Sequence, residues 1–128
     1  MKKIMIVDDE PDQIFAAKIF LEKHGEYEVI GANNGDHCFE LLEQGQIPDL
    51  ILLDLMMPEM SGWTVHDRLK KKSSEFKKIP IIFLTGDLDP DSIEIGGWFG
   101  EDFIEKPYDR EDLKKRIDAV LKNKDKVK

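Results

Sequence analysis

Five short apolar runs divide the chain, and charged or turn-forming residues bound each of them. Runs of this kind, rich in β-branched residues, predict buried strands. They cover residues 3–7, 27–32, 49–55, 81–84 and 102–104. The segments between them carry apolar residues at helical spacing, which predicts helices over about 12–25, 36–45, 63–72 and 109–122. Because strands alternate with helices, we expect an α/β fold, a five-stranded parallel sheet covered by helices on both faces.

Local signals support several of these helix starts. Pro11 suits a first helical turn, and Ser61 can cap the helix that begins near Trp63. Asp109, with Asp112 three residues later, forms a weak capping box.

Two segments fit the helical pattern poorly. Residues 87–100 should hold the fourth helix, but Gly96 and Gly97 each cost a helix interior about 1 kcal/mol relative to alanine. We therefore expect a short or distorted helix there. Residues 123–128 carry no apolar stripe, which predicts a frayed tail after a single domain over residues 1–122.

Composition narrows the class of protein. The net charge of -8 and the pI of about 4.9 argue against nonspecific binding to nucleic acid or to an anionic membrane. The single cysteine, Cys38, allows no internal disulfide and reads as a small buried residue. No apolar run approaches the roughly 18 residues that a membrane span needs. The N-terminus does not read as a signal peptide, so we expect a soluble protein of the cytoplasm.

Polar residues follow the predicted strands where each strand ends. Asp8 and Asp9 end the first, Asp54 lies at the end of the third, Thr85 ends the fourth and Lys106 follows the fifth. The carboxyl ends of parallel strands form one edge of the sheet, where ligands bind in such folds. Three carboxylates at one edge repel each other unless a divalent cation lies between them, and oxygen ligands suit Mg²⁺.

The same set of residues suits a phosphoryl group. A magnesium ion and the ammonium of Lys106 can neutralise phosphoryl oxygens, and the hydroxyl of Thr85 can donate a hydrogen bond. The carboxylate of Asp54 can act as a nucleophile that forms an aspartyl phosphate. Taken singly, an acid after a strand often only caps the next helix, as Asp9 or Glu10 could here, so the joint pattern carries this interpretation.

Four motifs in order resemble a known family. They are IMIVDDEP, PDLILLDLMMPEMSGW, PIIFLTG and DFIEKPY, and together they extend the resemblance over about residues 2–122. The chain is similar to the CheY-like receiver domains of response regulators in two-component signalling. The resemblance implies a doubly wound, flavodoxin-like sheet with strand order 2-1-3-4-5.

The resemblance also implies a metal site and a phosphoacceptor. Asp54 would take a phosphoryl group from a phosphohistidine on a sensor kinase. Asp9 would bind Mg²⁺ directly and Asp8 through water, with Asp54 and the backbone carbonyl of Met56 as further ligands.

A second group of residues would read out the modification. In receivers the residue matching Thr85 moves toward the phosphoryl group, and the one matching Lys106 forms an ion pair with it. Pro107 would follow a cis peptide bond. Phe103 stands at the switching aromatic position, which is often tyrosine, so it can pack but cannot donate a hydroxyl.

The expected partners are a sensor histidine kinase or phosphotransfer protein and a separate output protein, since no output domain follows in this sequence. The protein would be a regulator that catalyses only its own phosphorylation and dephosphorylation. Two alternatives remain open: a receiver-like binding module that is never phosphorylated, and a magnesium-dependent phosphohydrolase. The hydrolase class needs an acid where this chain has Met56.

Overall fold

A computed structural model describes residues 1–23, 25–86 and 102–126, with side chains described to residue 123. Its five parallel strands form one sheet in the order β2-β1-β3-β4-β5, which confirms the implied order. The strands are β1 (Lys2–Val7), β2 (Tyr27–Ala32), β3 (Leu50–Asp54), β4 (Ile81–Thr85) and β5 (Asp102–Glu105).

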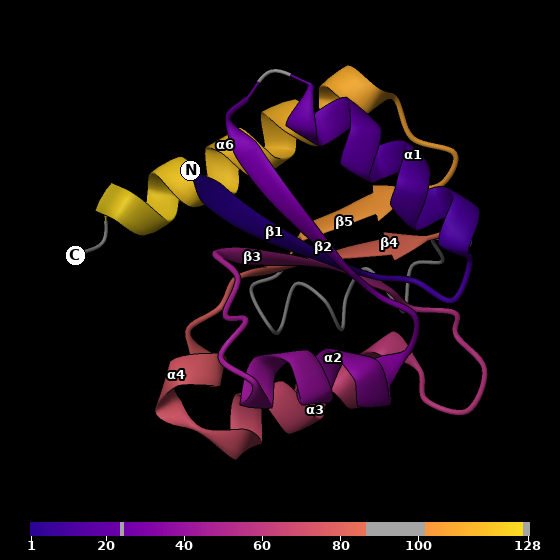
Figure 1. Cartoon of the computed structure of the whole chain (residues 1–128), viewed down its shortest axis with the longest axis vertical. Helices are drawn as coiled ribbons and strands as arrows, with labels where there is room; N and C mark the ends of the chain where they lie inside the picture. The colour runs from indigo at the N-terminus through magenta and orange to yellow at the C-terminus, as the bar shows by residue number, and fades with distance from the viewer. Residues whose placement is uncertain (24, 87–101, 127–128) are drawn as a thin grey trace.

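Helices lie on both faces of the sheet, as predicted. The described helices are α1 (Pro11–Glu22), α2 (Gly35–Glu43), α3 (Gly62–Lys72), α4 (Ser74–Lys77) and α6 (Arg110–Lys126). Figure 1 shows α1 and α6 on one face and α2, α3 and α4 on the other. The distorted helix predicted within 87–100 falls outside the described residues. None of the helices in the described part combines the length and apolar character needed to cross a bilayer.

Caps account for where the helices begin. The hydroxyl of Ser61 accepts the backbone N–H of Thr64, which confirms the predicted cap of α3. The Asp109 carboxylate accepts the N–H of Glu111 at the start of α6.

Two helical segments differ from the sequence-based expectation. The four-residue helix α4 was not predicted, because it is too short to show periodicity; Ser73 caps it by accepting the N–H of Phe76. Helix α6 continues to Lys126, past the last apolar residue of its stripe. Lysine has good helix propensity, and backbone hydrogen bonds need no apolar stripe. Fraying of the tail stays a prediction.

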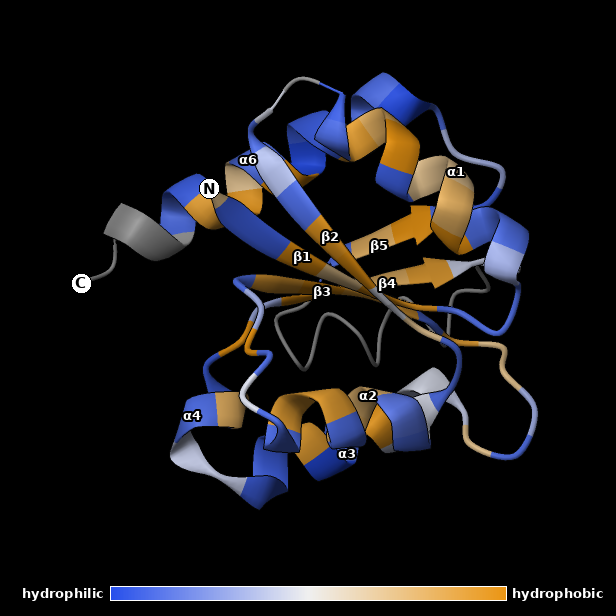
Figure 2. Ribbon diagram, in the orientation of Figure 1, coloured by the Kyte–Doolittle hydropathy of each residue, from blue (hydrophilic) through white to orange (hydrophobic). Residues whose placement is uncertain are grey.

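Alternation along the strands divides the core into two layers. Met5 and Ile51 point to the side of α2 and α3, whereas Ile4 and Leu52 point to the side of α1 and α6. The apolar residues lie on the strands and on the helix faces toward them (Figure 2). The interior strands β3 and β4 are buried along their whole length and β1 is buried over Ile4–Val7, so the positions of the residues that follow them are fixed.

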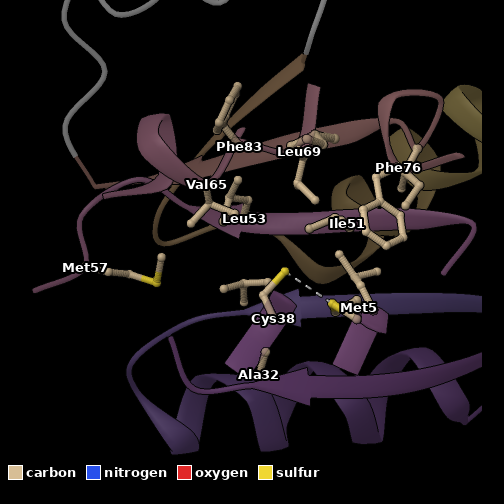
Figure 3. Packing of buried hydrophobic residues seen from close by; sticks show 14 of the residues in the cluster. Met5, Ala32, Cys38, Ile51, Leu53, Met57, Val65, Leu69, Phe76 and Phe83 are labelled. Atoms are coloured by element: carbon tan, nitrogen blue, oxygen red, sulfur yellow. Dashed lines mark hydrogen bonds between the residues drawn. The ribbon is translucent and has the colours of Figure 1, made fainter. Parts of the chain in front are cut away.

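Cys38 is fully buried, as predicted, and it faces the sheet from α2. Its Sγ lies 3.7 Å from Met5 Sδ, in a fully buried cluster shown in Figure 3. Burial raises the pKa of the Cys38 thiol to about 12, so this residue packs rather than reacts.

Candidate functional site

The predicted site residues come together at the carboxyl edge of the sheet. Val7 pairs with Leu53 and Asp54 pairs with Leu84, so the ends of β1, β3 and β4 are in register. Asp8 follows β1 directly, and Asp54 is the last residue of β3. The parallel register is thus what brings residues far apart in sequence to one edge.

Three carboxylates form the centre of this edge. One oxygen from each of Asp8, Asp9 and Asp54 lies within 4.8 Å of the other two. Asp8 and Asp54 are 1% and 5% exposed, whereas Asp9 is exposed to solvent. Like charges this close are unfavourable in a partly dehydrated site unless a cation compensates them. An all-oxygen set that is open on one side matches the coordination preference of Mg²⁺, which keeps several waters.

Lys106 supplies a positive charge to the cluster. Its Nζ donates to Asp8 Oδ2 at 2.9 Å and lies 3.6 Å from Asp54 Oδ2. Burial alone would lower the pKa of Lys106, but the hydrogen bond and charge of Asp8 and the charge of Asp54 outweigh it, and the pKa is raised. The lysine is therefore a fixed cation. The Lys106–Pro107 bond is cis, as expected.

The electrostatics of Asp54 follow from its burial. Desolvation raises the pKa of this carboxyl, and the charges of Asp8 and Asp9 act in the same direction. Lys106 and the backbone N–H of Met56, which donates to Asp54 Oδ1 at 3.1 Å, offset only part of the rise. Asp54 is thus held in a position where added positive charge would stabilise its anion.

The loop after β1 contains a contact that the sequence did not indicate. Capping of α1 by Asp9 or Glu10 was an alternative role for these acids, but the N-cap residue Glu10 makes no side-chain cap bond. Instead Asp8 Oδ1 accepts the backbone N–H of Glu10 at 2.9 Å. Asp8 therefore accepts two hydrogen bonds, one from the loop backbone at Oδ1 and one from Lys106 at Oδ2.

Gly62 is a positioning residue that sequence reasoning missed. Its N–H donates to the carbonyl of Leu55 at 3.0 Å, which fastens the start of α3 to the end of β3. A Cβ at this position would lie 2.5 Å from the Asp54 carbonyl oxygen. The Ser-Gly pair before an amphipathic segment indicates a helix start, but not this close approach.

Thr85 is the last residue of β4, and Phe103 lies in β5, the strand paired with it. Thr85 is 1% exposed, and its carbonyl accepts the N–H of Lys106 at 2.7 Å. The ring of Phe103 stacks on that of Phe83 with centroids 5.3 Å apart, and it lies 6.0 Å from Trp63. The ring centroids of Trp63 and Phe83 lie 4.8 Å apart, so Trp63 belongs to the same aromatic cluster.

Met56 does not point into the cluster. Its side chain is 71% exposed, and only its backbone contacts Asp54. This agrees with the expectation that the side chain takes no part in binding; the role of its carbonyl stays a prediction.

Comparisons with known proteins agree on one family. The model of the response regulator receiver domain matches residues 4–118. The chain is 37% identical to the protein PilH of Pseudomonas aeruginosa over 94% of this chain and 98% of PilH. The chain is also 39% identical to a probable cyclic di-GMP phosphodiesterase of Vibrio cholerae, but it spans only 27% of that protein's length. It spans about half or less of the length of most other curated relatives that it matches.

Solved structures give the same result. A CheY-like receiver domain protein from Methanospirillum hungatei superposes with a TM-score of 0.87 at 26% identity, covering 100% of this chain and 99% of that one. The chemotaxis protein CheY4 of Vibrio cholerae gives 0.83 at 27% identity, covering 94% and 98%. With this fold, this strand order and a family match over nearly all described elements, the chain belongs to the response regulator receiver domains, the CheY-like domains of two-component systems.

Proposed function

We propose that this receiver is a phosphoacceptor switch in which Asp54 is the modified residue. One observation carries the proposal: Lys106 Nζ lies 2.9 Å from Asp8 and 3.6 Å from Asp54, at the edge of a cluster of three carboxylates. Four charged groups from three separate chain segments converge where a parallel sheet presents its ligands. A structural role alone would not need three acids around one lysine.

The proposed donor is a phosphohistidine on a sensor kinase or phosphotransfer protein. A carboxylate oxygen of Asp54 attacks phosphorus, a P–O bond forms, and the P–N bond to the imidazole breaks. The electron pair of that bond returns to the ring nitrogen of the donor. The N–H of Met56 and the strand before Asp54 hold the nucleophile in place, so that it approaches in line with the leaving group.

The cluster fits Mg²⁺ as the cofactor. Asp8, Asp9 and Asp54 would hold it, and the resemblance adds the backbone carbonyl of Met56. When bound, the ion would supply positive charge against the charge that develops on the phosphoryl oxygens. The ammonium of Lys106 faces the same region and contributes independently of the metal.

After transfer, the phosphoryl group would offer new hydrogen-bond and ion-pair partners to the neighbouring side chains. Lys106 would pair with it, and the hydroxyl of Thr85 would donate to it. Movement of Thr85 would alter the packing of Phe103, whose ring lies against those of Phe83 and of Trp63 on α3. The switch would then be a population shift between two packings, read by a separate output protein.

A phosphorylation assay tests this proposal. The chain is incubated with Mg²⁺ and acetyl phosphate, and its intact mass should rise by one phosphoryl group. The Asp54→Asn variant is the matched control and should show no change. Absence of labelling, with beryllofluoride also failing to bind, would favour the unphosphorylated binding module. Rapid multiple turnover of acetyl phosphate would favour the phosphohydrolase.

A further inference from the structure

A basic segment stands out in this acidic chain. Residues 68–78 hold six basic residues and one acid, Glu75, in a protein whose net charge is -8. They form the second half of α3, helix α4 and the turn into β4. Figure 1 shows α4 at the end of the sheet away from the arrowheads of β4 and β5. This segment is therefore remote from the carboxylate cluster.

Few cations of the segment have a clear structural role within the fold. Lys70 has one, because its Nζ donates to the carbonyls of Lys77 and Ile79. Lys71 pairs with Asp67 one turn earlier, but both side chains are more than half exposed, and such pairs contribute little to stability.

The other four cations differ in their surroundings. Lys72 pairs with Glu43 of α2. Arg68, Lys77 and Lys78 are exposed and make no ion pair within the described part of the chain. The dipole at the end of α3 favours cations in its last turn, but Arg68 lies before that turn and Lys78 beyond the helix. A structural explanation therefore covers only part of the cluster.

A hollow with an apolar floor adjoins these cations. It has a volume of about 440 Å³ and lies between α2 and α3, lined by Asp36, Phe39, Arg68, Lys71 and Lys72. Phe39 is only partly buried, and Lys72 Nζ lies 5.3 Å from its ring centroid. The space accommodates one large apolar side chain, and basic groups border it on the α3 side.

We propose that this surface, the α2–α3 hollow together with the exposed cations of 68–78, docks an acidic peptide segment of a partner protein. An apolar side chain of the segment would contact Phe39, while its carboxylates would pair with Arg68 and Lys71 of α3 and with Lys77 and Lys78 at the end of α4. This combination of an anchor and surrounding charges is typical of peptide recognition. Nucleic acid and anionic lipid fit less well, because they would present phosphates across the whole surface, including the exposed acids Asp36, Glu40 and Glu43 of α2. A peptide can place its apolar side chain against Phe39 and its carboxylates toward the cations of α3 and α4.

The proposal does not depend on phosphorylation of Asp54, and its test is separate. The probe is a short fluorescein-labelled peptide of glutamates around a central Leu-Phe pair. Fluorescence anisotropy should detect binding to the full chain that weakens as salt is added. A second peptide with Ser-Ser in place of Leu-Phe should bind at least fivefold more weakly. In ¹⁵N-labelled protein, the first peptide should shift the amide resonances of residues 36–43 and 68–78.

Charge-reversal variants decide between this surface and general attraction. Arg68→Glu and Lys71→Glu should each weaken binding at least fivefold while far-UV circular dichroism and labelling by acetyl phosphate stay unchanged. Lys122→Glu makes the same charge change at an exposed position of α6, on the other face of the sheet, and should alter affinity less than twofold. Equal losses in all three variants, equal binding of the two peptides, or tighter binding to duplex DNA or phosphatidylserine vesicles would each overturn the proposal.

Discussion

Replacing Gly62 by alanine tests how the nucleophile is positioned. The new Cβ would lie 2.5 Å from the carbonyl oxygen of Asp54 and 2.8 Å from the Cα of Leu55. A Cβ atom essentially never lies within 3.0 Å of a heavy atom of this kind, so the two backbones must separate by about half an ångström. Neither atom belongs to a flexible side chain, and β3 is buried between two layers. The strain therefore cannot be relieved by a rotamer change.

The magnitude follows from two opposing effects. Overpacking a rigid site costs about 1–3 kcal/mol. Alanine reduces the conformational entropy of the unfolded chain, which returns about 0.4–1 kcal/mol. We expect a net loss of about 1–2 kcal/mol in the free energy of unfolding, which for a chain of this size lowers Tm by about 4–8 °C. Because a 1 Å misplacement costs about a hundredfold in rate, half that shift should slow phosphorylation about tenfold.

Urea denaturation followed by circular dichroism measures the first effect, and the rate of mass increase with acetyl phosphate and Mg²⁺ measures the second. Gly86→Ala is the control for stability, because its Cβ would meet nothing within 4 Å; we expect a change within about 0.5 kcal/mol. A Gly62→Ala variant as stable as the original chain would refute the packing argument. A destabilised variant with an unchanged labelling rate would refute the claim that Gly62 positions Asp54.

Three further predictions concern stability. Asp54→Asn should raise Tm at pH 7 in magnesium-free buffer, since burial raises the pKa of this carboxyl and so penalises its charged form in the folded state; the gain should shrink once acid protonates Asp54. Ser61→Ala should cost about 1 kcal/mol in urea unfolding through loss of the α3 cap, and a smaller effect would show that the hydroxyl is not needed. The pKa of Glu22 is lowered in the folded state, and the largest cause is the hydrogen bond that its carboxylate accepts from the Val29 N–H. This hydrogen bond therefore stabilises the fold above the ordinary carboxyl pKa, and the stabilisation is lost as the pH falls through the lowered pKa. Glu22→Gln should therefore lower stability at pH 7 more than at pH 3, and equal losses at both would contradict this.

The sequence predicted the fold well where pattern and burial act together. Ile4–Val7 of β1 and Leu50–Leu53 of β3 are continuously apolar, which is typical of strands in a parallel sheet covered on both faces. The acids at the ends of parallel strands share an edge, which is why the sequence alone could group Asp8 and Asp54. Strand order, in contrast, came from the resemblance, because hydrophobic patterning does not distinguish one neighbour from another.

Features that depend on through-space distance were not accessible to sequence reasoning. Nothing local to Gly62 shows that its Cα approaches the end of β3, and nothing local to Asp8 shows that it accepts both a loop N–H and a lysine. The short helix α4 is likewise specified by the Ser73 cap rather than by a period. In each case the deciding contact joins groups whose relative position is set by the packed fold.

The carboxylate cluster and the buried strands depend on each other physically. Grouping Asp8, Asp9 and Asp54 with a single lysine leaves excess negative charge, which opposes folding. Mobile loops would let these acids move apart until water screened them. Here β1 and β3, packed on both faces, hold them at short range. The repulsion is therefore retained in the folded state, and a cation or a group bringing positive charge gains binding energy by relieving it. Weakening the anchoring of β3, as in Gly62→Ala, should thus reduce magnesium affinity as well as stability.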